Sequence, residues 1–413
     1  MGQNEKISRR QLLRTGALLA GGLPIAGGLL SKVQASPIYP AGNAAPGGSI
    51  LRPGTTGWDG QYRPGSKGWV EQEIALNAPA ELKARLFANE NPFGPSDKAK
   101  KAITDAMTKS YQYPFMYFKD LYQMIADREG ITPDNILFGA GSSPMLMAAA
   151  MYFSKPGGNI ITGDPSYEDL PTKATHFNAK WVKVPLTSDY KLDLDAMEKA
   201  IDGNTSLVYI CNPNNPTATV VDTEKLRGFC ERVSKRVTVF VDEAYIDYLP
   251  DPAGTTLVSG VRAGQNIIVA RTFSKLHGFA GLRVGYIMAQ PDMIKKLEDY
   301  TEGPMSISAT SLQAALASYQ DKEYLQGALK KTLASKEYLY DVLKKEGYTY
   351  IPSSANFVMF PLKMDGEHFA SEMMKRGVGV RSWVLGGSNQ WCRVSIGRMD
   401  EMEAFATAFK ELS

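Results

Sequence analysis

Short apolar segments alternate with amphipathic stretches through the middle of this chain, and that alternation constrains the fold more than any other feature. Runs rich in β-branched residues lie at 159–162, 206–210, 238–241 and 266–270. Stretches with helical spacing lie between them at 193–201 and 222–235. Strands that alternate with helices predict a mainly parallel sheet covered by helices. We therefore predict an α/β fold, on which ligands bind at the carboxyl ends of the strands.

The length of the chain predicts more than one domain. Its 413 residues are 44% hydrophobic, which is enough to bury a large core, and they exceed the usual size of a single domain. We predict a large domain over 111–305 and a smaller α+β domain built from 81–110 and 306–413. Residues 36–80, whose first part is rich in glycine and proline, predict an extended arm or linker.

The smaller domain is expected to combine helices with short strands. Helices are predicted at 311–345, 366–375 and 402–412. Strands are predicted at 348–361, 378–381 and 392–396. Closure of this domain on the larger one would exclude water from a site between them.

Polar residues with catalytic potential follow the predicted strands. Asn215, Asp242 and Lys275 each come after one of the β-branched runs, so they are expected to meet at one edge of the sheet. Pyridoxal phosphate (PLP) needs a lysine for a Schiff base, a partner for its pyridine nitrogen and a cradle for its phosphate. We predict PLP as the cofactor, Lys275 as the catalytic lysine that binds it, and Asp242 as the partner of the ring nitrogen.

A turn rich in glycine and serine predicts the phosphate site. The segment 139–143 follows a strand-like run and precedes a helical one, so its amides lie at a helix start, where anions bind. Ser142 lies in this turn. Ser274 and Arg283 flank Lys275 and can close around the same phosphate from the other side.

Further side chains complete the predicted cofactor site. Asn215 and Tyr245 both follow strands and can hydrogen-bond the phenolic oxygen of PLP. Tyr167 can stack on the pyridine face. Taken singly, each of these residues has an ordinary structural explanation, such as a helix cap or core packing. The order and spacing of the whole set are what indicate a PLP site.

The motifs that carry these residues resemble those of one enzyme family. They are RLFANENPFGPS at 85–96, NPNNPT at 212–217, VDEAY at 241–245, the Lys275 segment, GVR at 379–381 and CRVSIG at 392–397. From about residue 84 onward the chain resembles the class I/II aminotransferases of PLP fold type I, and most of all their histidinol-phosphate aminotransferase branch. The resemblance implies a seven-stranded type of sheet in the large domain and a homodimer with shared active sites.

The resemblance also implies roles for individual residues. Ser143 and Thr272 would join the serines and the arginine already named around the cofactor. Tyr113 would reach the phosphate from the neighbouring subunit. Arg393 would clamp the substrate α-carboxylate, with Asn215 and Asn91 beside the substrate. A guanidinium fork binds a planar carboxylate through two hydrogen bonds, which gives the Arg393 prediction a physical basis.

These features predict a PLP-dependent aminotransferase. It would move an α-amino group from an amino acid, or from the amino-terminal residue of a peptide metabolite, to a 2-oxo acid. One alternative keeps PLP but changes the chemistry at Cα to that of an oxidase, lyase, racemase or decarboxylase. A second alternative, a non-catalytic binding protein on the same fold, is disfavoured by the presence of both Lys275 and Asp242.

Residues 1–35 have the three-part form of a signal peptide. Arg9 and Arg10 form a twin-arginine pair, a glycine-rich apolar run follows at 17–30, and a small-x-small site ends at Ala35. We predict cleavage after Ala35, the twin-arginine export machinery as a partner and a periplasmic location. This route carries folded proteins, which suits an enzyme that acquires PLP in the cytosol.

Charge and composition exclude several other functions. Residues 1–35 carry a net charge of +4, so their removal changes the charge of the chain from +3 to −1 and gives no reason to expect nucleic acid as a partner. No later segment reaches the roughly 20 apolar residues of a membrane span. The histidines are scattered, so no metal is expected, although His277 is expected to line the site. The cysteines are expected to be buried free thiols: Cys211, Cys230 and Cys392.

Overall fold

The computed structural model describes residues 82–413. The predicted signal peptide at 1–35 and the predicted arm at 36–80 lie outside the described residues. The described part contains two sheets of three or more strands, each with its own helices and its own hydrophobic core. Within it, no helix combines the length and the apolar character that spanning a bilayer requires.

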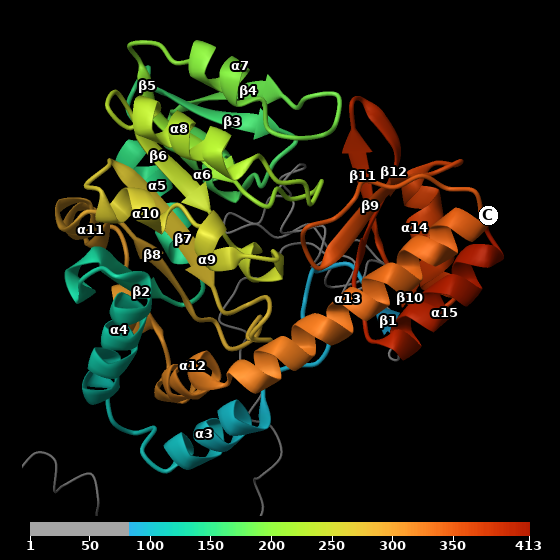
Figure 1. Cartoon of the computed structure of the whole chain (residues 1–413), viewed down its shortest axis with the longest axis horizontal. Coiled ribbons are helices and arrows are strands. Elements are labelled where there is room, and N and C mark those ends of the chain that lie inside the picture. The colour runs from blue at the N-terminus through green and yellow to red at the C-terminus, as the bar shows by residue number, and fades with distance from the viewer. Residues whose placement is uncertain (1–81) are drawn as a thin grey trace, which may run out of the picture. The chain divides into compact units, whose positions relative to one another are not determined.

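The larger sheet has seven strands in the order β2-β8-β7-β6-β5-β3-β4 (Figure 1). Five of these strands, from β7 to β4 in that order, pair in parallel, and β8 is antiparallel to both of its neighbours. The prediction of an α/β fold with a mainly parallel, seven-stranded sheet is therefore confirmed. The strands are β2 (Ile136–Gly139), β3 (Asn159–Asp164), β4 (Lys180–Pro185), β5 (Thr205–Cys211), β6 (Thr238–Asp242), β7 (Ile267–Thr272) and β8 (Gly285–Met288).

Two strands of this sheet were not predicted. β4 lies at one edge, and most of its side chains are exposed or half-buried, so its sequence lacks a continuous apolar run. β8 is only four residues long and follows directly on the Lys275 segment, so it was not separated from that motif. Both strands depend on pairing with a neighbour, which local sequence does not reveal.

Helices cover both faces of the seven-stranded sheet, because adjacent residues of a buried strand point to opposite faces. Ile160 and Ile161 of β3 illustrate this, since they belong to different hydrophobic clusters. One face packs against α5 (Ser143–Phe153), α6 (Asp169–His176) and α11 (Pro291–Glu298). The other packs against α3 (Asp97–Met107), α4 (Phe115–Glu129), α7 (Leu194–Lys199), α8 (Thr223–Val233), α10 (Val258–Arg262) and α12 (Ala309–Gln320).

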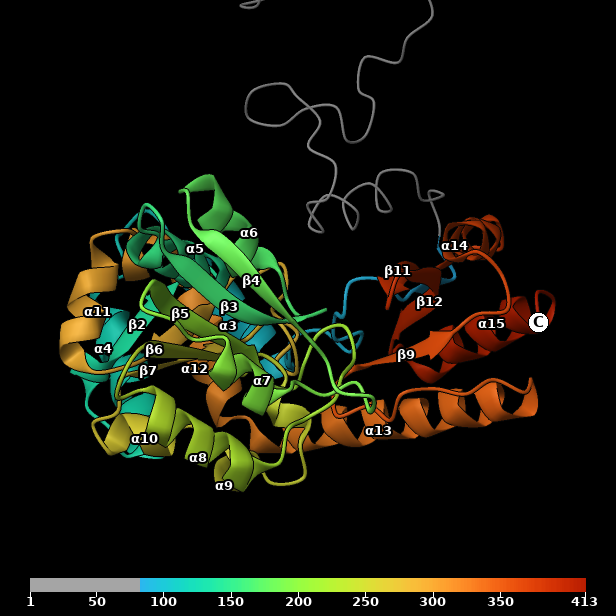
Figure 2. The ribbon, with the colours of Figure 1, turned by 90° about the horizontal axis from the view of Figure 1, so that it is seen from above.

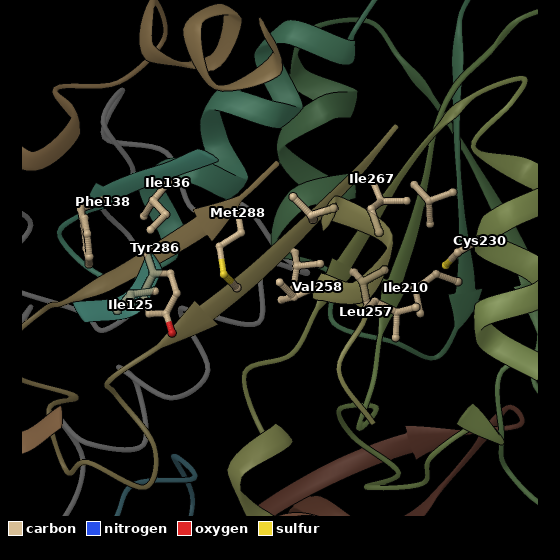
Figure 3. Packing of buried hydrophobic residues seen from close by; sticks show 14 of the residues in the cluster. Ile125, Ile136, Phe138, Ile210, Cys230, Leu257, Val258, Ile267, Tyr286 and Met288 are labelled. Atoms are coloured by element: carbon tan, nitrogen blue, oxygen red, sulfur yellow. The ribbon is translucent and has the colours of Figure 1, made fainter. Parts of the chain in front are cut away.

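Figure 3 shows part of this second cluster, with Tyr286 and Met288 of β8 near Ile125 of α4. Short elements complete the large domain: η1 (Pro133–Asn135), η2 (Ile246–Tyr248), α9 (Pro252–Thr255) and η3 (Gly303–Ser306). Because α3 and α12 pack on the large-domain core, the contacts favour placing both helices with the large domain. The predicted boundaries at 110/111 and 305/306 remain predictions.

The small domain is built around an antiparallel sheet in the order β11-β12-β9. Figure 2 shows the long α13 and α15 side by side against this sheet. The α+β character predicted for this part of the chain agrees with its elements. They are β1 (Ala84–Arg85), α13 (Lys322–Lys345), β9 (Phe357–Pro361), α14 (Gly366–Lys375), β10 (Val378–Gly379), β11 (Arg381–Leu385), β12 (Ser388–Ser395) and α15 (Met399–Lys410).

The single helical region predicted at 311–345 is two helices, which meet at Asp321. This residue ends α12 and begins α13 with φ −86° and ψ 64°, outside the helical region. Its buried carboxylate accepts a hydrogen bond from Lys98 Nζ at 2.9 Å, and Lys98 lies on α3. No glycine or proline marks the break, so the local sequence shows little sign of it.

The strand predicted at 348–361 is also shorter than expected. Only Phe357–Pro361 forms β9, and Ile351 adds an isolated bridge to Met359. The intervening loop at 352–356 packs on α13 instead, where the buried Lys336 amine donates to the Ser353 carbonyl at 2.7 Å. That interaction depends on a lysine distant in sequence, so the local pattern could not show it.

His277 does not line the predicted site, and the expectation that it would is wrong. Its imidazole is buried in the large domain and contacts Ser318 Oγ of α12 at 2.8 Å. Burial lowers the pKa of His277 to about 4. The charged form is therefore disfavoured in the folded protein, and the ring is neutral at pH 7.

A pH dependence of stability follows from His277. Because its folded pKa lies below the ordinary 6.5, its contribution is fully present above pH 6.5 and is lost as the pH falls toward 4. When the pH is lowered from 7.5 to 4.5, the free energy of unfolding should fall by roughly 2–3 kcal/mol less in His277→Gln than in the unmodified chain. Urea denaturation of the apoprotein at both pH values measures this difference. Equal losses for the two proteins would contradict it.

Candidate active site

A cavity of about 230 Å³ lies where several strands of the large sheet end. β2, β5, β6 and β7 run in the same direction, since β2 and β7 are both antiparallel to β8, so their carboxyl ends share one edge. Ten of the residues predicted to bind the cofactor or substrate line the cavity. They are Ser142, Ser143, Tyr167, Asn215, Asp242, Tyr245, Thr272, Ser274, Lys275 and Arg283.

Lys275 presents its amine to this cavity from the loop after β7. Its Nζ donates a hydrogen bond to the Asn89 carbonyl at 3.2 Å and lies 5.3 Å from the centre of the Tyr245 ring. The loop returns through Gly278, whose φ is +75°. A Cβ at Gly278 would collide with the backbone of Gly94, so this close approach requires glycine.

Asp242 ends β6 with its side chain buried beneath the cavity. Its Oδ2 accepts a hydrogen bond from the Tyr209 hydroxyl at 2.9 Å, and its Oδ1 accepts one from the Ala244 amide at 3.0 Å. Burial raises the pKa of Asp242 to about 6, while these hydrogen bonds and the Lys275 charge act in the opposite direction. A carboxylate held in this way suits a cationic partner in the cavity.

The turn before α5 forms an anion cradle at the other end of the cavity. Ser142 is the N-cap residue of this eleven-residue helix and Ser143 is its first residue, and both line the cavity at a helix start, where anions bind. Arg283 Nη1 donates to Ser274 Oγ at 3.3 Å, and Thr272 Oγ1 donates to the same hydroxyl at 2.9 Å. A cation, hydroxyls and amides thus converge on one place.

Two glycines make this cradle possible. A Cβ at Gly141, whose φ is +82°, would collide with the Arg283 guanidinium. A Cβ at Gly285 would lie 2.5 Å from the backbone carbon of Gly141 and from the Ser142 amide nitrogen. Arg283 itself has φ +54°, a strained conformation for a residue other than glycine, and such strain is often found at functional sites.

Arg393 reaches the site through a hydrogen bond. It lies buried on β12, where its Nη1 donates to Asn215 Oδ1 at 2.8 Å and its Nη2 donates to the Phe87 carbonyl at 2.8 Å. Arg393 does not line the cavity, but Asn215 does. The small domain therefore contributes one guanidinium directly behind a cavity residue of the large domain.

Asn91 and Tyr113 do not line the cavity of their own chain. The buried Asn91 side chain donates from Nδ2 to the Leu276 carbonyl at 2.6 Å and accepts a bond from the Phe93 amide. It thus supports the loop that carries Lys275. Tyr113 lies just before α4, 75% exposed, and its ring contacts that of Phe115. Its predicted role in a neighbouring subunit remains a prediction.

Sequence reasoning missed two residues next to the predicted set. Asn89 lines the cavity, although it was quoted only as part of a motif, and Tyr209 bonds Asp242 from within β5. Asn89 lies in an Asn-Glu-Asn-Pro turn and could have been noted as a residue that tolerates positive φ. Tyr209 carries no local signal, because its position in an apolar strand resembles core packing.

The cysteines are buried free thiols, as predicted. Burial raises the pKa of all three thiols, so they are protonated at neutral pH. Cys211 also lines the cavity, but its sulfur donates weakly to the Pro213 carbonyl at 3.4 Å. It therefore contributes shape rather than a nucleophile.

These residues fit PLP on their own chemistry. The cavity holds an amine, a buried carboxylate and a cradle of amides, hydroxyls and a guanidinium, which are the three parts that this cofactor requires. The carboxylate at the end of β6 and the amine after β7 come from separate segments, so two independent parts of the chain supply groups that PLP requires. The glycines at 141 and 285 allow the Arg283 guanidinium and the serine turn to approach each other closely, which brings the parts of the cradle together.

Comparison with known proteins decides the family. Residues 83–409 match the model of aminotransferase class I and II. The chain belongs to the class I and II aminotransferases. It is 35% identical to the histidinol-phosphate aminotransferase of Moorella thermoacetica, over 79% of this chain and 85% of that protein. It is 37% identical to histidinol-phosphate aminotransferase 2 of Carboxydothermus hydrogenoformans, over 79% of this chain and 90% of that protein.

Solved structures agree with this membership. The histidinol-phosphate aminotransferase of Sinorhizobium meliloti in complex with pyridoxal-5′-phosphate superposes with a TM-score of 0.76 and 26% identity, covering 83% of this chain and 95% of that one. Thermus thermophilus aspartate aminotransferase with maleate shares the fold at a TM-score of 0.69. This aminotransferase thus has the PLP type I fold and uses PLP, and both predictions are confirmed.

Proposed function

We propose that this aminotransferase moves the α-amino group of an amino acid, or of the amino-terminal residue of a peptide metabolite, to a 2-oxo acid in the periplasm. The observation that carries the proposal is the meeting of Lys275, Asp242 and Arg283 in one cavity, with Arg393 one hydrogen bond away. These residues can bind a phosphorylated, aldehyde-bearing ring and present an amine to it.

Each residue has a definite task in this proposal. PLP, when bound, draws electrons away from the substrate Cα. Asp242 would hold the ring nitrogen protonated, and Lys275 would take the proton from Cα and later return a proton to the cofactor. The hydroxyls, amides and Arg283 of the cradle would hold the phosphate. Asn215 and Tyr245 would bond the phenolic oxygen, Tyr167 would stack on the ring, and Asn91 supports the lysine loop.

Arg393 fixes the substrate α-carboxylate and thereby selects α-amino acids. Its fork gives two parallel hydrogen bonds to a carboxylate, which also orients the Cα–H bond relative to the cofactor ring. Arg393→Lys should therefore raise KM for the amino donor about 10- to 100-fold, the equivalent of losing one charged hydrogen bond. Steady-state kinetics measure this. The matched control is Arg376→Lys, which changes an arginine in an ion pair with Glu372 of α14. An unchanged KM in Arg393→Lys would refute the carboxylate clamp.

A second subunit completes the site in this proposal. Large apolar side chains around the start of α4 are exposed, as expected of a surface that another copy covers: Met107, Tyr111, Tyr113, Phe115 and Met116. Tyr113 from that copy would reach the phosphate. The aminotransferase would then be a homodimer with shared active sites, and Tyr113→Phe should weaken PLP binding only if the subunits associate.

The size of the donor is suggested by a second cavity of about 650 Å³. Asp164 and Glu168 of the large domain line it together with Arg381 and Trp383 of the small one. Its lining residue Glu168 directly follows Tyr167, which lines the PLP cavity. Donors with long or charged side chains therefore fit. Histidinol phosphate, the substrate in the names of the relatives, is a second candidate; it carries a phosphate ester where an α-amino acid carries its carboxylate, so Arg393 would bind that phosphate instead.

The periplasmic location depends on residues 1–35, through their twin-arginine pair and apolar run. Cell fractionation tests it, with a full-length chain in which Arg9 and Arg10 are both lysine as the control. Recovery of the unmodified chain in the cytosol would remove the compartment from the proposal and leave the chemistry unaffected. It would also favour histidinol phosphate over an exported peptide metabolite.

The reaction is tested with the chain that begins after Ala35, loaded with PLP. Amino acids, short peptides and histidinol phosphate are screened for conversion of the bound cofactor to its amino form, read by absorbance. Added 2-oxoglutarate or pyruvate should then restore the original spectrum. Donor consumption without any need for a 2-oxo acid would instead indicate an oxidase, lyase, racemase or decarboxylase. A protein that stays colourless with PLP would indicate a binding protein.

A further inference from the structure

Asn89 joins the two domains at the cavity, because it bonds Ser395 of the small domain and both Tyr245 and Lys275 of the large one. It is buried and precedes Glu90 in the turn after β1. We propose that Asn89 is a positioning residue that directs the proton of the Tyr245 hydroxyl into the cofactor cavity. The inference rests on the PLP site of the proposed function and concerns a residue to which that function assigned no task.

The hydrogen bonds around Asn89 fix the direction of each proton. The backbone N–H of Asn89 donates to Ser395 Oγ at 2.7 Å, so this hydroxyl oxygen is an acceptor. The Ser395 proton is then donated to Asn89 Oδ1 at 3.0 Å. With Oδ1 identified as the acceptor, the other end of the Asn89 amide is Nδ2, which donates to the Tyr245 hydroxyl oxygen at 3.1 Å. The reverse amide orientation would remove the acceptor of the Ser395 proton.

The Tyr245 proton must consequently point elsewhere. A phenol has one proton, and its oxygen already accepts a bond from Asn89. Tyr245 lines the cavity, and the rest of its ring packs against Phe357. The open direction for the O–H is the cavity, where the phenolic oxygen of PLP would accept it. Asn89 therefore makes Tyr245 a donor at the place where a donor is useful.

The backbone of Asn89 supports the same arrangement. Its φ is +54°, a conformation that asparagine tolerates better than most residues. In this conformation its carbonyl accepts hydrogen bonds from Lys275 Nζ at 3.2 Å and from Asn356 Nδ2 at 3.1 Å. One residue thus orients both the amine and the phenol that face the cofactor.

The network also links Tyr245 to the proposed substrate clamp. Arg393 and Ser395 belong to the same strand, β12, and alternate residues of a strand share one face. Ser395 holds the Asn89 amide, and Arg393 holds Asn215. The small-domain strand that binds the carboxylate in our proposal therefore also sets the hydrogen bonding of Tyr245 in the large domain.

The chemical consequence is measurable without turnover. A hydrogen-bond donor to the phenolic oxygen of PLP stabilises the negative charge on that oxygen. The oxygen then attracts less strongly the proton on the nitrogen that would join PLP to Lys275. That nitrogen then titrates at lower pH, and its titration changes the absorbance of the bound cofactor. Removing the donor should raise this pKa.

The test is Asn89→Asp, which keeps the size and the tolerance of positive φ but replaces the donor by an acceptor. Tyr245 must then donate to the new carboxylate instead of into the cavity. We expect the pKa from the absorbance titration to rise by about one unit, a tenfold change in proton affinity, as in Tyr245→Phe. The dissociation constant of PLP, measured by dialysis, should rise in both variants.

A double variant separates this role from the added charge. On the Tyr245→Phe background, Asn89→Asp should shift the pKa by less than about 0.3 units, because the phenol through which it acts is gone. A shift of undiminished size on that background would overturn the proposal, since it would be a direct charge effect. An unchanged pKa in Asn89→Asp, in an experiment where Tyr245→Phe raises the same pKa, would also overturn the proposal.

Ser395→Ala provides a second variant if Asn89→Asp does not fold. It removes the donor to Asn89 Oδ1 and leaves Asn89 in place, so a smaller rise of the same pKa is expected. An unchanged pKa in Ser395→Ala would then count against the network. Failure of the proposed function is distinguishable, because the unmodified protein would bind PLP and titrate normally yet convert no amino donor.

Discussion

Lys275→Ala should reduce kcat by at least about 10⁴-fold and abolish the covalent attachment of PLP. The variant loses the amine that joins the cofactor and, in our proposal, the base that moves the Cα proton, a role worth about 10²- to 10⁴-fold alone. The cavity itself should persist, because Asp242 and the serine turn before α5 come from other segments of the chain. Kinetics and borohydride labelling, followed by peptide mapping, measure both effects.

Lys101→Ala is the control for this experiment, since that lysine lies exposed on α3. It should keep full activity and full labelling. Thermal melting of both variants shows whether the fold is retained. A labelled peptide that does not contain residue 275, or appreciable turnover by a well-folded Lys275→Ala protein, would overturn the assignment of the catalytic lysine.

Asp242→Asn should lower kcat by about 10²- to 10³-fold while making the apoprotein more stable. The loss reflects the missing negative charge opposite the ring nitrogen, an electrostatic contribution that commonly has this size. Asparagine can still accept the hydrogen bond from the Ala244 amide. Steady-state kinetics measure the first effect and urea denaturation of the apoprotein measures the second.

The stability gain depends on pH in a defined direction. The folded pKa of Asp242, about 6, lies above its ordinary 3.8, so its stabilising contribution is present below pH 3.8 and is lost as the pH rises through 6. At pH 8 the ionised, buried carboxylate should cost roughly 3 kcal/mol relative to asparagine, and at pH 5 about half of that. An equal or smaller gain at pH 8 than at pH 5 would contradict this account.

The two titrations act in opposite directions over the same range. Acidification removes the stabilising contribution of His277 and relieves the cost of burying the ionised Asp242. Because the two effects partly cancel, the free energy of unfolding of the unmodified protein should depend less on pH than either group alone would make it. The pair illustrates a general difference between the residues. His277 is buried for packing, whereas Asp242 is buried for the charge that the site needs.

Much of the site was predictable because its residues occupy strand ends. Asp242 directly follows an apolar run, and Lys275 follows another with glycines and hydroxyls around it, so the order of the motifs specified the edge of the sheet. The mainly parallel sheet followed from the same alternation, whereas its seven strands were implied by the resemblance to the family. The elements missed, β4 and β8, are an edge strand and a short antiparallel strand, which are formed by their neighbours rather than by their own sequence.

By itself, the sequence determined which chemistry the chain carries. An amine, a carboxylate and an anion cradle each follow a strand-like run. They could be recognised because local patterns of apolar and polar residues define strands and their ends. Only the tertiary structure decided how these groups are held. The Tyr209 bond to Asp242, the Asn215 bond to Arg393 and the Asn89 network join residues far apart in the chain. Such hydrogen bonds depend on angles and distances between elements, and no local pattern encodes them.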